Sequence, residues 1–592
     1  AAIIGPTVKG PAFVPTVVKS FAEFERKFGP LSKDTYVPQT AREYLKNAGS
    51  LTIVRVLAGG GYTVNKSAIA IVASGSTAAT STQIGGLVLG VIMGSKNTAT
   101  PDLSLSSLTA TAISTTTDRT LVLNGTNTTT KTNTVSLNPS ATNYYTKVIG
   151  SDPNISKTAT DTYDGLGGYT YINFKSLQTA FHNDTQTTLL PTHTDYVGSG
   201  SCTILLASSS AMVFNGNQGN NEGYAYASTP MITSQLALGS KSLFRFHTID
   251  HGKEMAKQYK ISIANLKEPG DIDGVEQYSQ FSVIIRKTND KDKNPVILEQ
   301  YNNVTLDPDS PRYISRVIGD RYPQYNDTLG KVELLGNYPN ISNLIRVEVA
   351  QAVGEKATSP KLSPKGFKAV RNPIRENVFT PTFTTPSASY EGTQTIGGNY
   401  NTKAFLGFKF IDKEPDNEAF LQPLPDNNTA NISGDFNVEN YSGHPSSSLF
   451  SGSLSASIDT TGATGPTSNQ LKFTIPFQGG QDGVRPDIIK QTGANIVGSN
   501  LYGYDLSTTA KAGYKGYKKA IDVLANQDEY DINMLATPGV IHSLHPLITQ
   551  AGIDMCEARG DAFYVMDLNG VEDSVNQAVG HVGTLDTNYA AV

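Results

Sequence analysis

The hydrophobic pattern of the first thirty residues predicts a strand, an extended segment and a helix. Residues 3–18 are rich in Val and Ile and are broken by Gly and Pro, which is typical of a strand, a turn and an extended edge segment. Ser20 and Glu23 form a capping-box pattern, and Gly29-Pro30 is a stop signal. The helix between them has one apolar face, made by Phe21, Phe24 and Phe28.

The next thirty residues repeat this pattern and complete an α/β unit. Thr40 and Glu43 are the expected cap and return partner of a second helix, and Gly49 is its expected end. Residues 51–57 are mostly apolar, as in a buried strand. Strand, helix, helix and strand in this order predict α/β structure.

The last third of the chain returns to α/β order. Apolar residues at helical spacing predict a helix over residues 508–526 and another over 543–559, with Gly560 beyond its end. Residues 531–536 and 562–568 are expected to be strands. Strand, helix and strand here predict a βαβ unit.

The intervening chain is rich in Ser, Thr, Gly and Asn, and its apolar residues alternate. Only two charged residues lie between Lys66 and Asp118. Alternating stretches such as 67–74 and 120–123 predict short strands joined by polar turns. A disordered Ser/Thr linker is the alternative, and the regular recurrence of Ile, Val and Leu counts against it.

Charge returns in the middle of the chain. Residues 280–286 and 296–306 have the pattern of a hairpin across a polar turn. A short helix should follow, with Ser310 as its cap, Pro311 at its first position and Gly319 at its end.

Together these patterns predict a multi-domain α/β plus β protein. Its α/β core is expected to form from the two chain ends, residues 1–58 and 476–592, with β-rich domains inserted between them. We expect an inserted peripheral β-domain at 59–205, a middle α+β domain at 206–375 and a β-rich segment at 376–475.

Composition narrows the class of partner. The chain has 592 residues, of which 17% are charged, and its net charge is -5. No global basic field is present to hold nucleic acid or anionic lipid, so protein partners are expected, without direct nucleic acid binding. The longest apolar run, residues 85–94, is too short for membrane insertion. Cys202 and Cys556 are expected to be buried free thiols.

Three patterns could suggest metal binding, and each is incomplete. The segment 290–294 begins like a calcium loop, but Pro295 and Tyr301 occupy the positions that need Gly and Glu, so a charged hairpin turn is expected. The pair His247 and His251 has a spacing possible for zinc, yet its segment alternates like a strand. A second histidine pair, His542 and His545, has no Cys or carboxylate companion. Structural roles are expected for all four histidines.

The remaining motifs also favour structural interpretations. Arg559-Gly560-Asp561 spells the tripeptide that integrins bind, but here it joins a helix to a strand. The basic stretch 356–371 is expected to be a solvated linker or a subunit contact. The glycines at 479–483 lack the context of a phosphate-binding loop, and neither G-x-x-x-x-G-K-[ST] nor G-x-S-x-G is present. The sequence therefore predicts no enzyme, with no catalytic, cofactor or metal site.

Blocks of sequence at both ends and in the middle resemble contractile bacteriophage tail sheath proteins. The middle block, Leu306-Asp-Pro-Asp-Ser-Pro-Arg-Tyr-Ile with Ile318-Gly-Asp, is similar to that family's middle domain. The other blocks resemble its N-terminal and C-terminal segments and lie at residues 2–16, 20–24, 28–29, 51–56, 479–483, 517–520, 529–535, 559–564 and 585–591. The segment 60–205 lies outside the resemblance.

The resemblance implies a structural virion protein. Its subunits would form hexameric rings stacked helically around a tail tube protein, with baseplate and tail terminator proteins at the two ends. Contraction would drive the tube through the host envelope during genome ejection, after assembly in the host cytoplasm.

A carbohydrate-binding protein and a glycosidase are the alternatives to a sheath subunit. A secreted or surface β-rich carbohydrate-binding protein fits the Ser/Thr/Asn-rich middle, but the chain has no Trp for sugar stacking. A glycosidase has only unassigned acidic residues in its favour. For the sheath, we expect further terminal segments in the particle, and we expect residues 1–592 alone to be mostly monomeric with concentration-dependent association.

Overall fold

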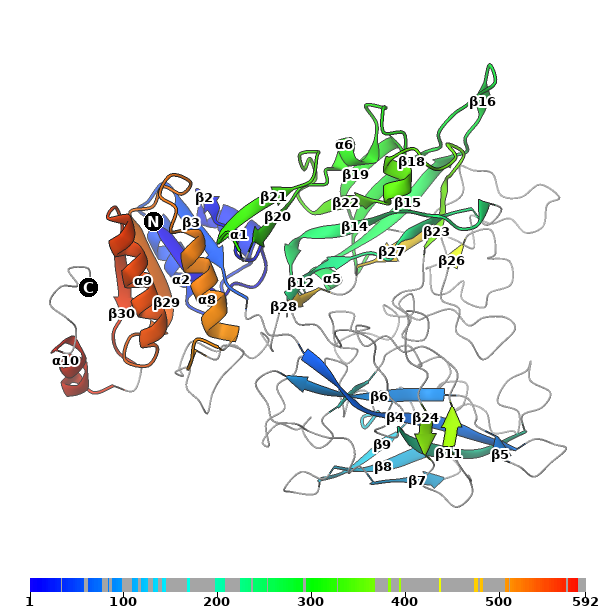
Figure 1. Ribbon diagram of the computed structural model, residues 1–592, viewed down its shortest axis with the longest axis horizontal. Coiled ribbons are helices and arrows are strands. Elements are labelled where there is room, and N and C mark those ends of the chain that lie inside the picture. The colour runs from blue at the N-terminus through cyan, green and yellow to red at the C-terminus, as the bar shows by residue number, and fades with distance from the viewer. Residues whose placement is uncertain are drawn as a thin grey trace.

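The computed structural model describes residues 1–57, 224–367 and 506–583, apart from short gaps, and separate strands between these stretches. The protein is mixed α/β with several sheets and few helices, and it is mostly β-rich. In Figure 1 the blue N-terminal strands lie beside the orange and red C-terminal elements, and the green strands form a second body.

The first sheet takes strands from both ends of the chain. Its order is β2-β3-β1-β29-β30, with bounds Thr16–Val18, Leu51–Arg55, Ala2–Gly5, Met534–Ile541 and Phe563–Asp567. The central strand β1 is parallel to both neighbours: Ala2 lies opposite Thr52 on one side and opposite Leu535 on the other. The two ends are therefore joined by backbone hydrogen bonds (Figure 1).

Two N-terminal helices, α1 (Phe21–Phe28) and α2 (Val37–Leu45), cover one face of this sheet. Ile3 and Ile53 point to that face and pack with the helices in one buried cluster, which Ala536 of β29 also contacts. Side chains alternate between the two faces along each strand, so the neighbouring residues of β1 and β3 face the other way.

The opposite face is covered by α8 (Ala512–Val523) and α9 (Pro546–Arg559). Ile4 and Val54 pack there against both helices. The helix α9 approaches β30 closely at Gly552, where a Cβ would lie 2.9 Å from a ring carbon of Tyr564.

The predicted C-terminal elements are confirmed in type and order. The helices predicted at 508–526 and 543–559 are α8 and α9, and the strands predicted at 531–536 and 562–568 are β29 and β30. A further helix, α10 (Val575–Gly583), was not predicted from the sequence.

The predicted cap of the first helix is confirmed, and that of the second is wrong. The Ser20 hydroxyl accepts the Glu23 N–H, while the Glu23 carboxylate accepts the Lys19 N–H. The helix α2, however, begins at Val37 with proline in its first turn, so Thr40 lies inside it. Proline's fixed φ suits the first turn, and the helix starts four residues earlier than the Thr40 and Glu43 pattern suggests.

The middle of the chain forms two facing sheets. One has the order β26-β23-β13-β14-β12-β28, with β22 also paired to β14; their bounds are Phe436–Asn437, Pro364–Phe367, Ile232–Ser234, Ser242–His251, Tyr224–Ser228, Gln481–Asp482 and Ile345–Val349. The other has the order β19-β18-β15-β27, with bounds Ile297–Thr305, Gln280–Lys287, Tyr259–Lys267 and Phe473–Pro476.

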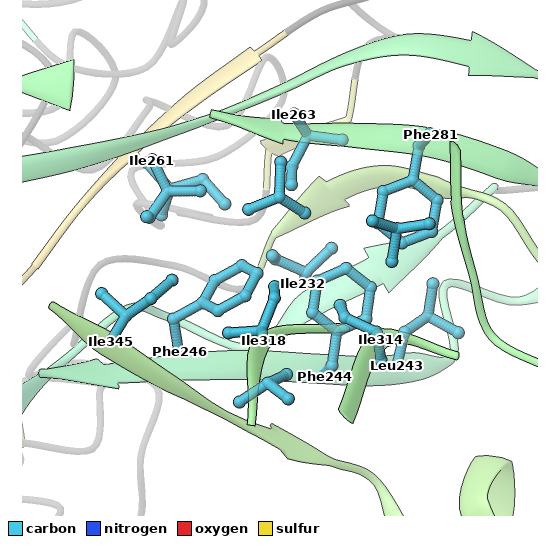
Figure 2. Packing of buried hydrophobic residues seen from close by; sticks show 14 of the residues in the cluster. Ile232, Leu243, Phe244, Phe246, Ile261, Ile263, Phe281, Ile314, Ile318 and Ile345 are labelled. Carbon is cyan, nitrogen blue, oxygen red and sulfur yellow. The ribbon is translucent and has the colours of Figure 1, made fainter. Parts of the chain in front are cut away.

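An apolar core fills the space between these two sheets. The Phe244 ring from β14 stacks on the Phe281 ring from β18, with centroids 5.5 Å apart. Figure 2 shows Ile261 and Ile263 pointing from β15 towards the same layer. The short helix α6 (Ile314–Ile318) closes the core from the side.

The predicted hairpin is confirmed as β18 and β19, which pair antiparallel. The predicted helix starts later than expected, at Ile314, and Ser310 instead holds a turn by accepting the Arg312 N–H. Its predicted end is confirmed at Gly319, whose φ of 106° favours glycine. Smaller elements complete the unit: α5 (Met255–Gln258), α7 (Gln351–Gly354), β16 (Asp271–Ile272), β17 (Val275–Glu276), β20 (Tyr322–Asn326) and β21 (Lys331–Leu335).

The Ser/Thr-rich segment contains the predicted strands. The stretches 67–74 and 120–123 fall within β4 (Tyr62–Ser76) and β8 (Arg119–Gly125). The strand β8 forms a small sheet with β7 (Thr109–Ser114) and β9 (Lys131–Ser136). A wholly disordered linker is therefore wrong for these stretches.

A larger sheet links this segment to one further along the chain. It contains β4 and the strands β5 (Gln83–Ile84), β6 (Val88–Asn97), β10 (Gly168–Thr170), β11 (Val197–Ala207), β24 (Thr382–Thr384) and β25 (Thr393–Thr395). Leu206 of β11 pairs with Thr384 of β24. The rest of the predicted β-rich segment at 376–475 lies largely outside the described residues.

The sheet shared by both chain ends generates a stability prediction. A Cβ on Gly516 of α8 would lie 3.0 Å from the carbonyl oxygen of Leu57 and 3.2 Å from a methyl of Val56. We expect Gly516→Ala to push α8 away from the N-terminal strand and to destabilise this unit by about 1–2 kcal/mol. Differential scanning calorimetry should show a lower Tm.

The matched control is Gly580→Ala on α10, where nothing lies within 4 Å of the added Cβ. Alanine has the higher helix propensity, so this change should not lower the Tm. An unchanged Tm for Gly516→Ala would contradict the tight packing between the two chain ends.

Candidate functional site

Half of one face of the first sheet is uncovered among the described residues. The helices α1 and α2 pack over β1 and β3 but leave exposed the outward side chains of β29 and β30. Phe563 is 64% exposed and Val565 53%, and Met534 lies directly opposite Phe563. We call Met534, Phe563 and Val565 the open half-face.

The open half-face lies at a sheet edge. Among the described strands, β30 pairs only with β29, so its outer backbone groups are available to another strand. The following helix, α10, also exposes apolar side chains, Val575 and Val579. Exposed apolar residues that gather on one region of a protein are typical of protein–protein contacts.

A polar junction joins the first sheet to the middle unit. Arg55, at the end of β3, is almost fully buried and donates hydrogen bonds to the carbonyls of Thr7, Gly10 and His251. The His251 ring accepts the Ala12 N–H at Nδ1, over 3.2 Å. One arginine and one histidine thus tie the N-terminal segment to β14.

A second link runs from α8 to the β20–β21 hairpin. The Lys519 ammonium lies 4.1 Å from the centre of the Tyr325 ring and 5.2 Å from that of Phe13. These distances are within the range of cation–π attraction. The helix α8 therefore contacts the middle unit as well as the N-terminal segment.

Burial shifts three titratable groups on β14. Burial, with the charge of Arg55 adding to it, lowers the pKa of His251 to about 3. Burial likewise lowers the pKa of His247 to about 4, and it raises that of Asp250 to about 6. Only the neutral imidazole can accept the Ala12 N–H at Nδ1, so this hydrogen bond requires uncharged His251.

The two histidines proposed as a possible zinc pair have separate structural roles. His247 contacts Glu348 of β22, with 2.6 Å between Nε2 and the carboxylate, while His251 contacts Ala12. Glu348 also binds Arg245 through both of its oxygens, and the hydrogen bond from His247 is the main cause that lowers the pKa of Glu348 to about 2. The predicted strand through this pair is confirmed as β14.

The second histidine pair organises the entry to α9. His545 accepts the Ile541 N–H at Nδ1, and the His542 ring contacts the Thr549 hydroxyl at 2.8 Å. Both contacts stabilise the turn between β29 and α9, as the structural interpretation predicts. Within the described part of the chain, no group of three or more His, Cys, Asp or Glu is placed to hold a metal ion.

The charged hairpin turn at Asp290 is closed by ion pairs. The Asp290 carboxylate receives hydrogen bonds from Arg286 and the Val296 N–H, and it pairs with Lys260 at 2.7 Å. Burial acts to raise the pKa of Asp290, but the bonds from Arg286 and Lys260 outweigh it and hold the pKa below its ordinary value. Residues 291–293 of the calcium-loop pattern lie outside the described residues.

The Arg559-Gly560-Asp561 tripeptide is structural. Arg559 is buried and donates to the carbonyls of Leu524 and Tyr530, and it pairs with Asp561. Gly560 has a φ of 71° and ends α9. The arginine is therefore not displayed for an integrin.

The basic stretch 356–371 is more ordered than a solvated linker over its described part. Lys356 pairs with Asp309, Lys361 with Glu276, and Lys365 with Glu268. Residues 364–367 form β23, and Phe367 of this strand belongs to the core of the middle unit. The linker interpretation is wrong for this part, and residues 368–371 lie outside the described ones.

The cysteines and the glycine-rich stretch are only partly described. Cys556 is a free, buried thiol, and burial raises its pKa to about 11. The side chain of Cys202 lies outside the described residues, as do Gly479 and Gly483. Gly480 packs against the backbone of Gly252, where a Cβ would meet the carbonyl oxygen.

No protein-family model matches the chain. No curated protein is significantly similar to it.

In the described residues, no helix combines the length and apolar character needed to cross a membrane.

Sequence patterns missed the residues that build the junction. Arg55 interrupts the apolar run 51–57, and a charged residue at the end of a buried strand is the signal that could have identified it. Tyr226, whose ring stacks on His251 at 3.7 Å, has no comparable signal in the sequence.

The shifted groups at the junction predict a pH dependence. As pH falls below about 6.5, the unfolded chain protonates its histidines while His247 and His251 stay neutral in the folded protein, so stability falls. Asp250 acts in the opposite direction, because it takes up a proton near pH 6 in the folded protein and near 3.8 when unfolded. Asn cannot take up this proton. We therefore expect the Tm of Asp250→Asn to fall further than the Tm of the unmodified protein when the pH is lowered from 6.5 to 4.

The control for this prediction is Asp528→Asn, which changes an exposed aspartate of the C-terminal segment. It should follow the unmodified protein across the same pH range. Parallel Tm curves for Asp250→Asn and the unmodified protein would show that Asp250 titrates normally.

Proposed function

We propose that the chain is a structural subunit of a contractile bacteriophage tail sheath. In this proposal, an α/β core built from the two chain ends carries β-rich domains inserted between them. The order of the sheath-like sequence blocks supports it, since the N-terminal block contains β1 and β3 and the C-terminal blocks contain parts of α8 and β30. A sheet that unites these blocks is compatible with one polymerising unit.

The open half-face is the observation that carries this proposal. A sheet covered by helices on both faces needs no partner, whereas this sheet leaves Phe563 and Val565 in water. Contact with a second copy would bury these side chains and pair the edge of β30. A lattice of identical subunits needs such a surface on every copy.

The proposed role is mechanical. Subunits would form hexameric rings stacked around a tail tube protein, between baseplate and tail terminator proteins, as part of a virion. A change in packing between two arrangements of the same subunits would perform the work of contraction, and such a change needs no catalytic site in the chain.

Assembly of the purified chain tests this function. Sedimentation velocity should show a mostly monomeric protein whose association increases with concentration, and electron microscopy of the most concentrated protein should show six-fold rings without long tubes. Phe563→Lys should weaken association at least tenfold, because it places a charge in the contact. Discrete monomers at every concentration would overturn the sheath assignment.

The matched control is Val275→Lys, on the hairpin of β16 and β17. Val275 is 62% exposed, close to the value for Phe563, but lies far from the first sheet (Figure 1). This variant should associate like the unmodified protein. Equal association of both lysine variants and the unmodified protein would exclude the open half-face as the contact.

A further inference from the structure

The middle unit contains a pocket of about 440 Å³. It lies between α6, the β20–β21 hairpin, β22 and α7, whose residues line it. Three tyrosines, Tyr313, Tyr322 and Tyr338, contribute to its walls, and Arg346 is the only basic residue in its lining. The pocket is separate from the open half-face and from the junction residues Arg55 and Ala12.

Arg346 is buried, and its Nε has no hydrogen-bond partner. The residue is only 7% exposed. The guanidinium carbon lies 4.0 Å from the centre of the Tyr322 ring and 5.2 Å from that of Tyr226. Ring stacking covers the faces of a guanidinium and leaves its N–H edge to bind an acceptor.

The Glu348 carboxylate does not supply that acceptor. Glu348 lies two residues along β22 and also lines the pocket, but its oxygens are bound by Arg245 and His247 of β14. Leaving a buried charged donor unpaired is costly, so a site of this kind is stabilised when an anion binds. Burial lowers the pKa of Arg346, and the charge of Glu348 acts in the opposite direction.

The lining also defines the charge and shape of the anion. Asp320, Glu348 and Glu355 line the same pocket, and these acids would repel a multiply charged group such as phosphate more strongly than a singly charged carboxylate. One carboxylate can bind the guanidinium through two parallel hydrogen bonds. The tyrosine walls suit a flat or ring-shaped body attached to it.

We propose that this pocket binds a small monocarboxylate with a ring-shaped body, and that Arg346 binds its carboxylate. The inference does not depend on the proposed sheath function, because the pocket lies within one subunit. An aromatic acid and a sugar acid share this chemistry, and they differ in whether the ring is apolar or hydroxylated.

Isothermal titration calorimetry with benzoate and glucuronate tests the proposal. At least one of them should bind, and the stronger binder identifies the type of ring. Benzamide has the shape of benzoate without its charge and should bind at least tenfold more weakly, as should inorganic phosphate. Failure of both acids to bind, or equal binding of benzoate and benzamide, would overturn the proposal.

Variants then assign the site. Arg346→Gln should weaken binding of the acid at least tenfold, which corresponds to the loss of one charge-assisted hydrogen bond. Arg321→Gln is the matched control: it removes the same charge from the adjacent hairpin segment, and Arg321 does not line the pocket. It should bind like the unmodified protein. Equal binding by Arg346→Gln and Arg321→Gln would place the acid elsewhere.

A second variant covers the case in which Arg346→Gln does not fold, as circular dichroism would show. Gly354 lines the pocket, and a Cβ there would lie 3.8 Å from the Tyr313 hydroxyl, which is an ordinary contact. Gly354→Leu should therefore fold, place a side chain in the pocket and weaken binding while leaving Arg346 in place. Retained binding in folded Gly354→Leu would contradict the proposed site.

Discussion

The parallel pairing of β1 with β29 is the constraint on which the rest of the structure depends. Ala2 lies opposite Leu535, so almost the whole chain lies between two paired strands. The entropy of closing a loop grows slowly with length, by about 0.6 kcal/mol for each doubling, so a long connection is thermodynamically acceptable. Closing it is nevertheless slow, because such non-local contacts form late in folding. The intervening units therefore have time to fold before the sheet is complete.

Because the connection leaves and returns at one sheet, the middle unit must be held beside it. Arg55 does this by binding carbonyls of both the N-terminal segment and β14. The bond from Ala12 to His251 is possible only while the imidazole is neutral, and burial keeps it neutral. The junction is consequently polar and directional, whereas the contact within the first sheet is mainly apolar. Such a junction fixes one orientation of the two units, since each hydrogen bond is lost when its partners move apart.

The sequence was informative where the determinant was local. The Ser20 cap, the Gly560 terminator and the strand through His247 depend on residues within a few positions, and the structure has all three. The cap predicted at Thr40 is wrong because a second local signal, the proline in the first turn of α2, favours an earlier helix start. Arg55 and the open half-face could not be predicted in this way. Their roles depend on which distant segments pack beside them, and periodicity within one segment contains no such information.

The open half-face and the Arg346 pocket differ in what their exposed groups require. Phe563 and Val565 are apolar and lie on a sheet edge, so any surface that excludes water and offers a strand can cover them. Arg346 is buried, and its guanidinium lies within cation–π distance of two tyrosine rings, so it requires an acceptor of matching charge and geometry. The first requirement is met by a large partner such as another copy of the chain. The second is met by a small ligand, and the acids around the pocket restrict that ligand to a single negative charge.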